Sequence, residues 1–486
     1  MTDETAPPTP AAVAVPFAAI VLAMLPAVLD QTILATALPT IASDLGRLTD
    51  VAWLITAYVV AAAASTPLWG KLGDRHGRKR LLEISLVLFL VASALCGTAQ
   101  DISLLIVFRA IQGVAAGGLM TLAMAAVGDL VSPRERARYQ GYIAATFAIA
   151  TVAGPLLGGV IVQNVSWRWV FYINLPLGLA ALAGLHLHLP AAAGQGSRAA
   201  LDMLGAALLA AVTAGLMLTC VWGGQRYAWG SAEILALIGV TVILAGALVV
   251  RERRAAEPIV PFDLLRTRTV AIASIALFLT TASLFAVNVF VPLFLQTTTG
   301  ATPTQAGLLL VPMMLGITIS TNLAGRSITK TGRYKRFPVA GAMLMTLALA
   351  LLAVVTADPS RWTVGIGLAV FGLGFGMVGQ VLIVAVQNGV DRRQLGIAMA
   401  TTSFARGLGG AIGAALLGTI FAARVGTFGA AAAAGGLGRI PPAARSDVID
   451  GVQTVFIVAA PVAALALAVI LLLKEVPLKG PGGPPG

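Results

Sequence analysis

The chain is a succession of long apolar runs separated by short polar segments. A helix rises about 1.5 Å per residue, so a run of about 20 residues crosses the roughly 30 Å hydrocarbon core of a bilayer. Many runs are too rich in small residues to be strands, which predicts an all-α polytopic membrane protein with fourteen transmembrane helices. These runs lie at about residues 14–39, 51–70, 81–99, 103–128, 139–163, 169–189, 202–222, 231–250, 269–296, 304–324, 338–356, 362–387, 396–421 and 453–473.

A repeat with one constant offset of 255 residues groups these helices. The matched positions are Gly70 with Gly325, Gly77 with Gly332, Arg78 with Arg333, Arg138 with Arg393, Gly141 with Gly396, Gly154 with Gly409 and Gly158 with Gly413. Duplicated helical bundles are common in secondary transporters. The repeat predicts two six-helix bundles with pseudo-two-fold symmetry and a two-helix hairpin inserted between them.

Breaks in composition set the boundaries. A Pro- and Gly-containing stretch, PAAAGQGSR, precedes the hairpin, and a charged stretch, RERRAAEPIVPFDLLRTR, follows it. The expected parts are a cytosolic tail (1–13), an N-terminal six-helix bundle (14–190), a linker with the inserted hairpin (191–250), a cytosolic connector (251–268), a C-terminal six-helix bundle (269–473) and a cytosolic tail (474–486).

Composition and charge agree with a membrane location. Hydrophobic residues make up 58% of the chain and charged residues only 11%, whereas soluble domains have about 25% charged residues. The net charge of +12 does not indicate nucleic-acid binding, because 23 of the 32 Lys and Arg lie in the even-numbered loops and the C-terminal tail. By the positive-inside rule these loops and both termini are cytoplasmic, and their basic residues contact anionic lipids. We expect a monomer in the cell membrane.

The polar loop GKLGDRHGRKR, residues 70–80, connects the second and third runs. Asp74 can cap the following helix or pair with Arg78, and Asp129 lies at the same depth at the end of the fourth run. An anchor for lipid headgroups is the alternative interpretation. Close backbone approach in this loop is expected at Gly70, Gly73 and Gly77.

Asp30 is the acid that lies deepest within a run, and a buried charge in a membrane helix costs about 2.5 to 3.5 kcal/mol. It therefore needs a partner or a task. Arg109 lies at a similar depth, and the two side chains can meet or share Gln112. The functional interpretation is a carboxylate that exchanges a proton; the alternative is a neutral Asp30 bonded to a carbonyl group.

The fifth run carries the small-residue motif GPLLGG. We expect its glycines to let a neighbouring helix pack closely and its proline to kink the helix; small-residue packing with no role in coupling is the alternative. The residues are Gly154, Pro155, Gly158 and Gly159.

The candidates for a substrate cavity are aromatic, Met and amide residues of the second half, although packing or lipid contact explains such residues equally well. No acid lies in the second-half runs, which favours neutral or singly charged amphipathic substrates, and Arg406 would favour an anionic group. The candidates are Phe285, Asn288, Met313, Phe375, Gln380 and Gln387.

Together these motifs resemble the major facilitator superfamily, and within it the fourteen-span drug:proton antiporter branch. The resemblance covers essentially the whole chain. It is carried by GKLGDRHGRKR, by RAIQGVAAGG from Arg109, by GPLLGG, and by LDQTILATALP (29–39) together with WRWVFYINLPLG (167–178). It implies that Asp74, Arg78 and Asp129 form a cytosolic latch and that GPLLGG is the antiporter motif. The chain departs from the family pattern at Ala150 and Ala35, which stand where Gly and Asn are usual. The second-half copy of the loop has Thr329 at the position of Asp74.

The expected function is a proton-coupled antiporter that exports lipophilic drugs or antibiotics by alternating access. The alternatives are a dedicated exporter of one metabolite, lipid or sugar derivative, and a membrane scaffold or receptor without transport. With three His and few buried acids, the chain offers no catalytic constellation, so we expect neither an enzyme nor a cofactor beyond the proton as coupling ion. We expect the two cysteines, Cys96 and Cys220, to be inert buried thiols with no metal site.

Overall fold

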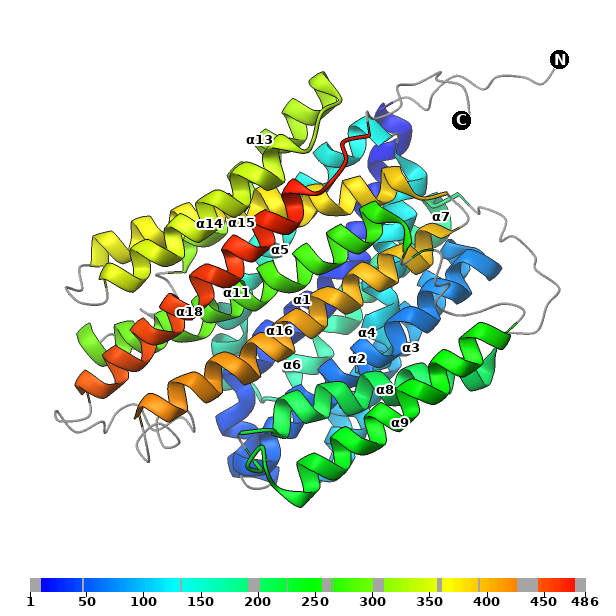
Figure 1. Cartoon of the computed structure of the whole chain (residues 1–486). Coiled ribbons are helices and arrows are strands. Elements are labelled where there is room, and N and C mark those ends of the chain that lie inside the picture. The colour runs from blue at the N-terminus through cyan, green and yellow to red at the C-terminus, as the bar shows by residue number, and fades with distance from the viewer. Residues whose placement is uncertain are drawn as a thin grey trace, which may run out of the picture.

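A computed structural model shows a helical membrane protein (Figure 1). The described residues are 10–45, 48–131, 133–190, 202–224, 226–255, 264, 266–299, 310–355, 361–391, 394–425 and 445–476. Thirteen helices within these ranges are long and apolar enough to cross a membrane. The remaining expected span, 304–324, falls partly outside the described residues and partly on a helix with hydroxyl and basic residues, Val311–Thr331.

The first half contains α1 (Pro10–Leu45), α2 (Leu48–His76), α3 (Arg78–Thr98), α4 (Ile102–Leu130), α5 (Pro133–Asn164), α6 (Trp169–Tyr172) and α7 (Asn174–His188). Two local signals set its helix ends. Gly77, at φ 90°, separates α2 from α3 in a conformation that a side chain would strain. Asp101 caps α4 by accepting a hydrogen bond from the backbone N–H of Leu104 at 2.8 Å.

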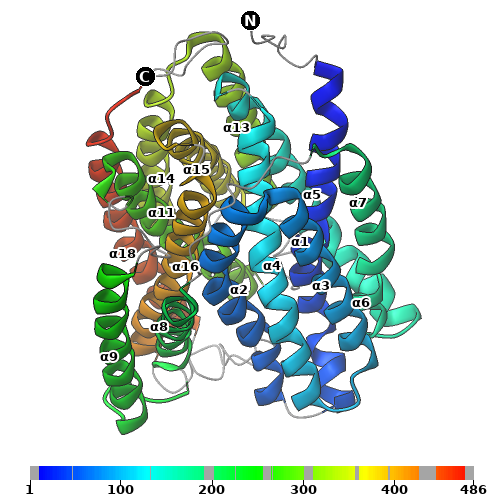
Figure 2. The same ribbon diagram turned by 90° about the vertical axis from the view of Figure 1, so that its right-hand side faces the viewer.

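The second half contains α11 (Arg268–Thr299), α13 (Val311–Thr331), α14 (Arg336–Val355), α15 (Arg361–Gly389), α16 (Leu395–Val425) and α18 (Arg445–Leu471). The left-handed Gly332 ends α13, and its N–H bonds to the carbonyl group of Ile328 at 2.8 Å. In Figure 2 the second half lies beside the first, and the helices of the two halves run roughly parallel.

The helices of both halves extend between the same two faces of the molecule. We call the end at which α1 begins and α18 ends the terminal face, and the other end the opposite face (Figure 2). Because successive helices alternate in direction, the α2–α3, α4–α5, α13–α14 and α15–α16 connections also lie at the terminal face.

The 255-residue repeat is visible in the contacts between the halves. A Cβ added to Gly70 of α2 would lie 2.7 Å from the carbonyl oxygen of Gly396 in α16. Its repeat partner Gly325, in α13, is in equally close contact with the backbone of Ala137 in α5. Gly141 of α5, the repeat partner of Gly396, also lies against α13, so the two contacts are equivalent by pseudo-symmetry.

The hairpin consists of α8 (Met203–Trp222) and α9 (Ala232–Arg254). Helix α8 packs against α2 of the first half and α16 of the second half (Figure 2). Asp202 caps α8 and also pairs with Arg251 of α9 at 3.0 Å. Near the opposite face, the indole N–H of Trp229 donates to the hydroxyl of Thr419 at 3.1 Å. The hairpin therefore contacts both halves.

We predict that Gly372→Val destabilises the second half, whereas Gly365→Val on the same helix does not. A Cβ at Gly372 would collide with the backbone of Met313, while a Cβ at Gly365 meets no atom within 4 Å. Overpacking typically costs about 1 to 3 kcal/mol, and a rigid backbone obstacle places Gly372→Val at the upper end. The melting temperature of the detergent-solubilised protein measures the difference; equal values for the two variants would contradict this account of the packing.

Candidate functional site

Asp30 of α1 and Arg109 of α4 form an ion pair in the interior of the first half. Each side chain is 1% exposed. The guanidinium group of Arg109 contacts the Asp30 carboxylate and donates to the amide oxygen of Gln112 at 2.7 Å. The amide nitrogen of Gln112 donates to Asp30 at 3.0 Å. The structure thus brings together the three residues that the sequence analysis selected for proton coupling.

Further groups complete this network, and sequence reasoning did not select them. The amide nitrogen of Asn174 donates to Asp30 at 3.1 Å and to the hydroxyl of Ser93 at 2.9 Å. The Arg109 guanidinium lies over the ring of Tyr58, 4.3 Å from its centroid. Asn174 was the signal available in the sequence, because it is an amide in an apolar run, within WRWVFYINLPLG.

The same motif fixes the opposite face. The indole N–H of Trp167 donates to Asp44, at the end of α1, at 2.8 Å, and Arg168 pairs with the same carboxylate at 3.3 Å. The hydrogen bond from Trp167 and the charge of Arg168 together lower the pKa of Asp44. WRWVFYINLPLG therefore binds α1 at two levels, through Asp44 at the surface and Asp30 in the interior.

Chemically, the centre of the Asp30 network is a buried ion pair with no net charge. A buried ion pair contributes little net stability, yet removing one partner leaves an uncompensated charge in a medium of low dielectric constant. Protonation of Asp30 would leave Arg109 as such an uncompensated charge.

A second charged cluster lies at the terminal face. Arg78 pairs with Asp74 at 2.9 Å and contacts the carboxylate of Asp129. The Asp74 carboxylate also accepts the backbone N–H groups of Gly396 and Ile397, at 2.9 and 3.1 Å. These N–H groups lie in the first turn of α16 and have no acceptor within that helix, and a negative charge is favourable at a helix N-terminus. Asp74 of the first half therefore caps a helix of the second half.

These contacts correct the expectation that Asp74 caps α3, and they explain the small residues at Gly70 and Gly73. Asp74 pairs with Arg78, one of the two predicted alternatives, but it does not cap the following helix, because the N-cap of α3 is Gly77 and no side chain bonds there. Instead, the close contact of Gly70 with α16 brings the Asp74 carboxylate within reach of the other half. Gly73 faces the side chain of Leu122 in α4, which explains why this position is small.

Arg136 of α5 forms another contact between the halves that sequence reasoning missed. Its guanidinium group donates to the carbonyl oxygen of Gln387 in α15 at 2.7 Å and contacts the carbonyl group of Gly128. The amide nitrogen of Gln387 donates in turn to the carbonyl oxygen of Met124 at 3.1 Å. At the terminal face, side chains of each half are thus bonded to backbone groups of the other half, and these bonds close this face.

The small-residue motif of α5 packs against α1. A Cβ on Gly154 would collide with Thr32, and one on Gly158 would lie 2.9 Å from the carbonyl oxygen of Ile33. The expectation for Gly159 was wrong, because no atom lies within 4 Å of its Cβ position. Five residues turn a helix by about 140° beyond one full turn, so Gly159 faces away from α1. The side chain of Pro155 lies outside the described residues.

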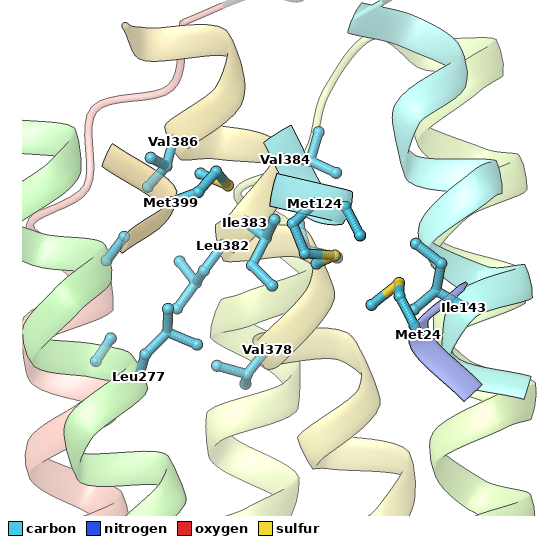
Figure 3. Packing of buried hydrophobic residues seen from close by; sticks show 14 of the residues in the cluster. Met24, Met124, Ile143, Leu277, Val378, Leu382, Ile383, Val384, Val386 and Met399 are labelled. Atoms are coloured by element: carbon cyan, nitrogen blue, oxygen red, sulfur yellow. The ribbon is translucent and has the colours of Figure 1, made fainter. Parts of the chain in front are cut away.

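A small cavity lies between the halves. Met24 of α1 and Met124 of α4 face Ile383 of α15 and Met399 of α16 (Figure 3). Its volume is about 20 Å³, whereas drug-sized ligands occupy about 300 to 1,000 Å³. This cavity is therefore closed around at most a water molecule. Its other lining residues are Met120, Phe147, Gln380, Thr402, Ser403 and Arg406.

Of the six cavity candidates from the sequence, Gln380 lines this cavity. Met313 is buried in the second half against α15, and Phe375 stacks on Phe371 at 6.4 Å between ring centroids. Phe285 is partly buried and Asn288 is exposed on α11. Gln387, described above, belongs to the contact between the halves.

Sequence comparison identifies the family. A profile of the Major Facilitator Superfamily matches residues 20–414. The chain belongs to the major facilitator superfamily. It is therefore a multi-pass transporter of this superfamily, which is not a family of enzymes.

Relatives within the superfamily agree. The chain is 36% identical to an uncharacterized MFS-type transporter of Mycobacterium tuberculosis, over 95% of this chain and 69% of the relative. It is 33% identical to Multidrug resistance protein 3 of Bacillus subtilis, over 95% of each chain. The solved structure of the proton:xylose symporter XylE has the same fold, with a TM-score of 0.63, 14% identity and coverage of 93% of this chain and 95% of XylE.

We predict that Arg109→Gln destabilises the protein more than the double variant Asp30→Asn/Arg109→Gln. Breaking a buried pair costs about 3 to 5 kcal/mol because it strands the remaining charge, and the double variant removes that charge as well. Melting temperatures of the purified variants measure the difference. The control is Arg168→Gln, at the partly exposed Arg168–Asp44 pair, which should change little. Additive losses from Asp30 and Arg109 would contradict their coupling.

We predict that Asp74→Ala opens the terminal face. It removes a charged acceptor from two N–H groups of α16, and hydrogen bonds to charged groups contribute about 1.5 to 3 kcal/mol, so opening should rise about tenfold or more. The measurement is the rate at which a thiol reagent labels Ala400→Cys in a chain whose native cysteines are replaced. Residue 400 lies next to Gly70 at the contact between the halves.

The matched control for this variant is Glu475→Ala. Its carboxylate accepts backbone N–H groups of Tyr334 and Lys335, all within the second half. Labelling should stay at the parental rate in this control. Equal rates in Asp74→Ala and Glu475→Ala would show that Asp74 does not hold the two halves together.

Proposed function

We propose that this protein is a proton-coupled antiporter that exports lipophilic drugs or antibiotics by alternating access. The observation that carries the proposal is the Asp30–Arg109 pair, because both charges are fully buried and the carboxylate can exchange a proton. The likeness to Multidrug resistance protein 3 of Bacillus subtilis supports drug export.

We place the terminal face on the cytosolic side of the cell membrane. The loops rich in Lys and Arg support this orientation through the positive-inside rule, with both termini in the cytoplasm. In this orientation the structure corresponds to a state closed toward the cytosol, with Asp74 bonded to α16 as part of the latch.

Coupling follows a continuous set of contacts. Asp30 lies on α1, and α1 packs on α5 through Gly154 and Gly158. Helix α5 in turn contacts α13 of the other half at Gly325. A change at Asp30 that moves α1 is therefore passed through α5 to the contact between the halves.

The proton supplies enough free energy for export. One proton that enters down 100 mV and one pH unit releases about 2.3 plus 1.4 kcal/mol, which sustains a substrate ratio of several hundred. Neither a bound cofactor nor a second subunit enters this scheme.

We predict that Asp30→Asn abolishes ethidium accumulation driven by a pH gradient in proteoliposomes, while exchange of ethidium across the membrane continues. The fixed neutral side chain cannot carry a proton, yet alternating access does not itself need one. The control is Asp44→Asn, which changes an exposed acid on the same helix and should retain coupling. Gradient-driven accumulation by Asp30→Asn would place the coupling site elsewhere.

A further inference from the structure

Arg406 of α16 lines the cavity between the two halves. It lies eleven residues after Leu395, where α16 begins, and therefore about 16 Å along the helix from the terminal face. This places a guanidinium group near the middle of the membrane-spanning part. Arg406 belongs neither to the Asp30–Arg109 network nor to the Asp74–Arg78–Asp129 latch.

No hydrogen bond or ion pair is formed by Arg406 within the part of the chain that the structure describes. The contrast with Arg109 is direct, because Arg109 has Asp30, Gln112 and the Leu54 carbonyl group as partners. A charged Arg at mid-helix costs about 2.5 to 3.5 kcal/mol on insertion scales. Such residues usually pair with one another or mark a ligand pathway, and Arg406 has no acidic neighbour in the cavity wall.

The other residues that line the cavity indicate the chemistry of its ligand. Met24, Met120, Met124 and Phe147 come from the first half and offer adaptable apolar contacts. Gln380 comes from the second half, as Arg406 does, and its amide oxygen is buried without a hydrogen-bond partner among the described residues. One side of the cavity is thus apolar, and the other carries a cation with an unpartnered acceptor.

We propose that Arg406 binds the carboxylate of acidic amphipathic substrates, whose apolar body lies against the Met-rich wall of the first half. A guanidinium group binds a carboxylate through two parallel hydrogen bonds. This inference rests on the proposed export function and specifies its substrate class. Because the cavity is closed in this state, the substrate enters only after the halves separate.

The test compares dansylglycine, whose carboxylate is ionised at pH 7, with dansylglycine amide, which has the same body without the charge. Transport is measured in proteoliposomes of zwitterionic phosphatidylcholine, so that no anionic lipid supplies the group. Arg406→Gln should raise the KM for dansylglycine about tenfold or more and leave the KM for the amide nearly unchanged, whereas Arg406→Lys should retain part of the preference. The control is Arg424→Gln, an exposed arginine near the other end of α16.

Binding without transport gives a second readout. Dansylglycine should raise the melting temperature of the wild-type protein in detergent more than its amide does, which keeps the test valid if Arg406→Gln fails to fold. An equal loss for both compounds in Arg406→Gln, or wild-type export of ethidium without any binding of dansylglycine, would overturn the inference and leave the export proposal intact. Absence of both ethidium and dansylglycine transport in the wild type would overturn the export proposal itself.

Discussion

The cost of burying a charge in an apolar medium governs this structure. The Asp30 carboxylate in the interior of the first half is stabilised by Arg109. Each of the two charged groups needs further hydrogen-bond partners, and these partners come from the surrounding helices. Asn174 of α7 and Gln112 of α4 donate to Asp30, while the Leu54 carbonyl group of α2 accepts from Arg109. Because bundle helices in a membrane gain little from the hydrophobic effect, such hydrogen bonds specify how the first half is assembled.

The second half shares the close glycine contacts of the first half and differs from it in the charges of its interior. Its helices meet through glycines such as Gly372 against Met313 and Gly409 against Phe278, with backbones in direct contact. Arg406 there stands without the acid that Arg109 has. The repeat therefore preserved the backbone arrangement of the two halves, whereas the charges in their interiors diverged. This fits the proposal that the first half binds the coupling ion and the second half contributes more to the substrate site.

The fold could be predicted from the sequence because the features that indicate it can be read directly along the chain. Apolar run length and a constant offset report helices and their duplication directly, and helical rise was sufficient to place Asp30 beside Arg109. Prediction from the sequence failed where the outcome depends on rotation or on the other half. Gly159 was assigned to the packed face although its helical angle turns it away. The pairing of Asp74 with Arg78 was predicted, but its bonds to backbone N–H groups 322 and 323 residues later were not. Backbone acceptors, such as the Gln387 carbonyl group bound by Arg136, carry no sequence signal at all.

In the proposed transport cycle, the contacts at the terminal face would let the two halves separate and close again. Asp74 binds N–H groups at the start of α16, and Arg136 binds a carbonyl group near the end of α15, so both side chains of the first half use the unsatisfied ends of second-half helices. Water can satisfy the same helix ends when the halves separate, so opening exchanges hydrogen bonds rather than losing them, at a net cost of about 0.5 to 3 kcal/mol for each. An interface of this kind closes reversibly, whereas an apolar contact of equal area would expose hydrocarbon surface to water at every cycle.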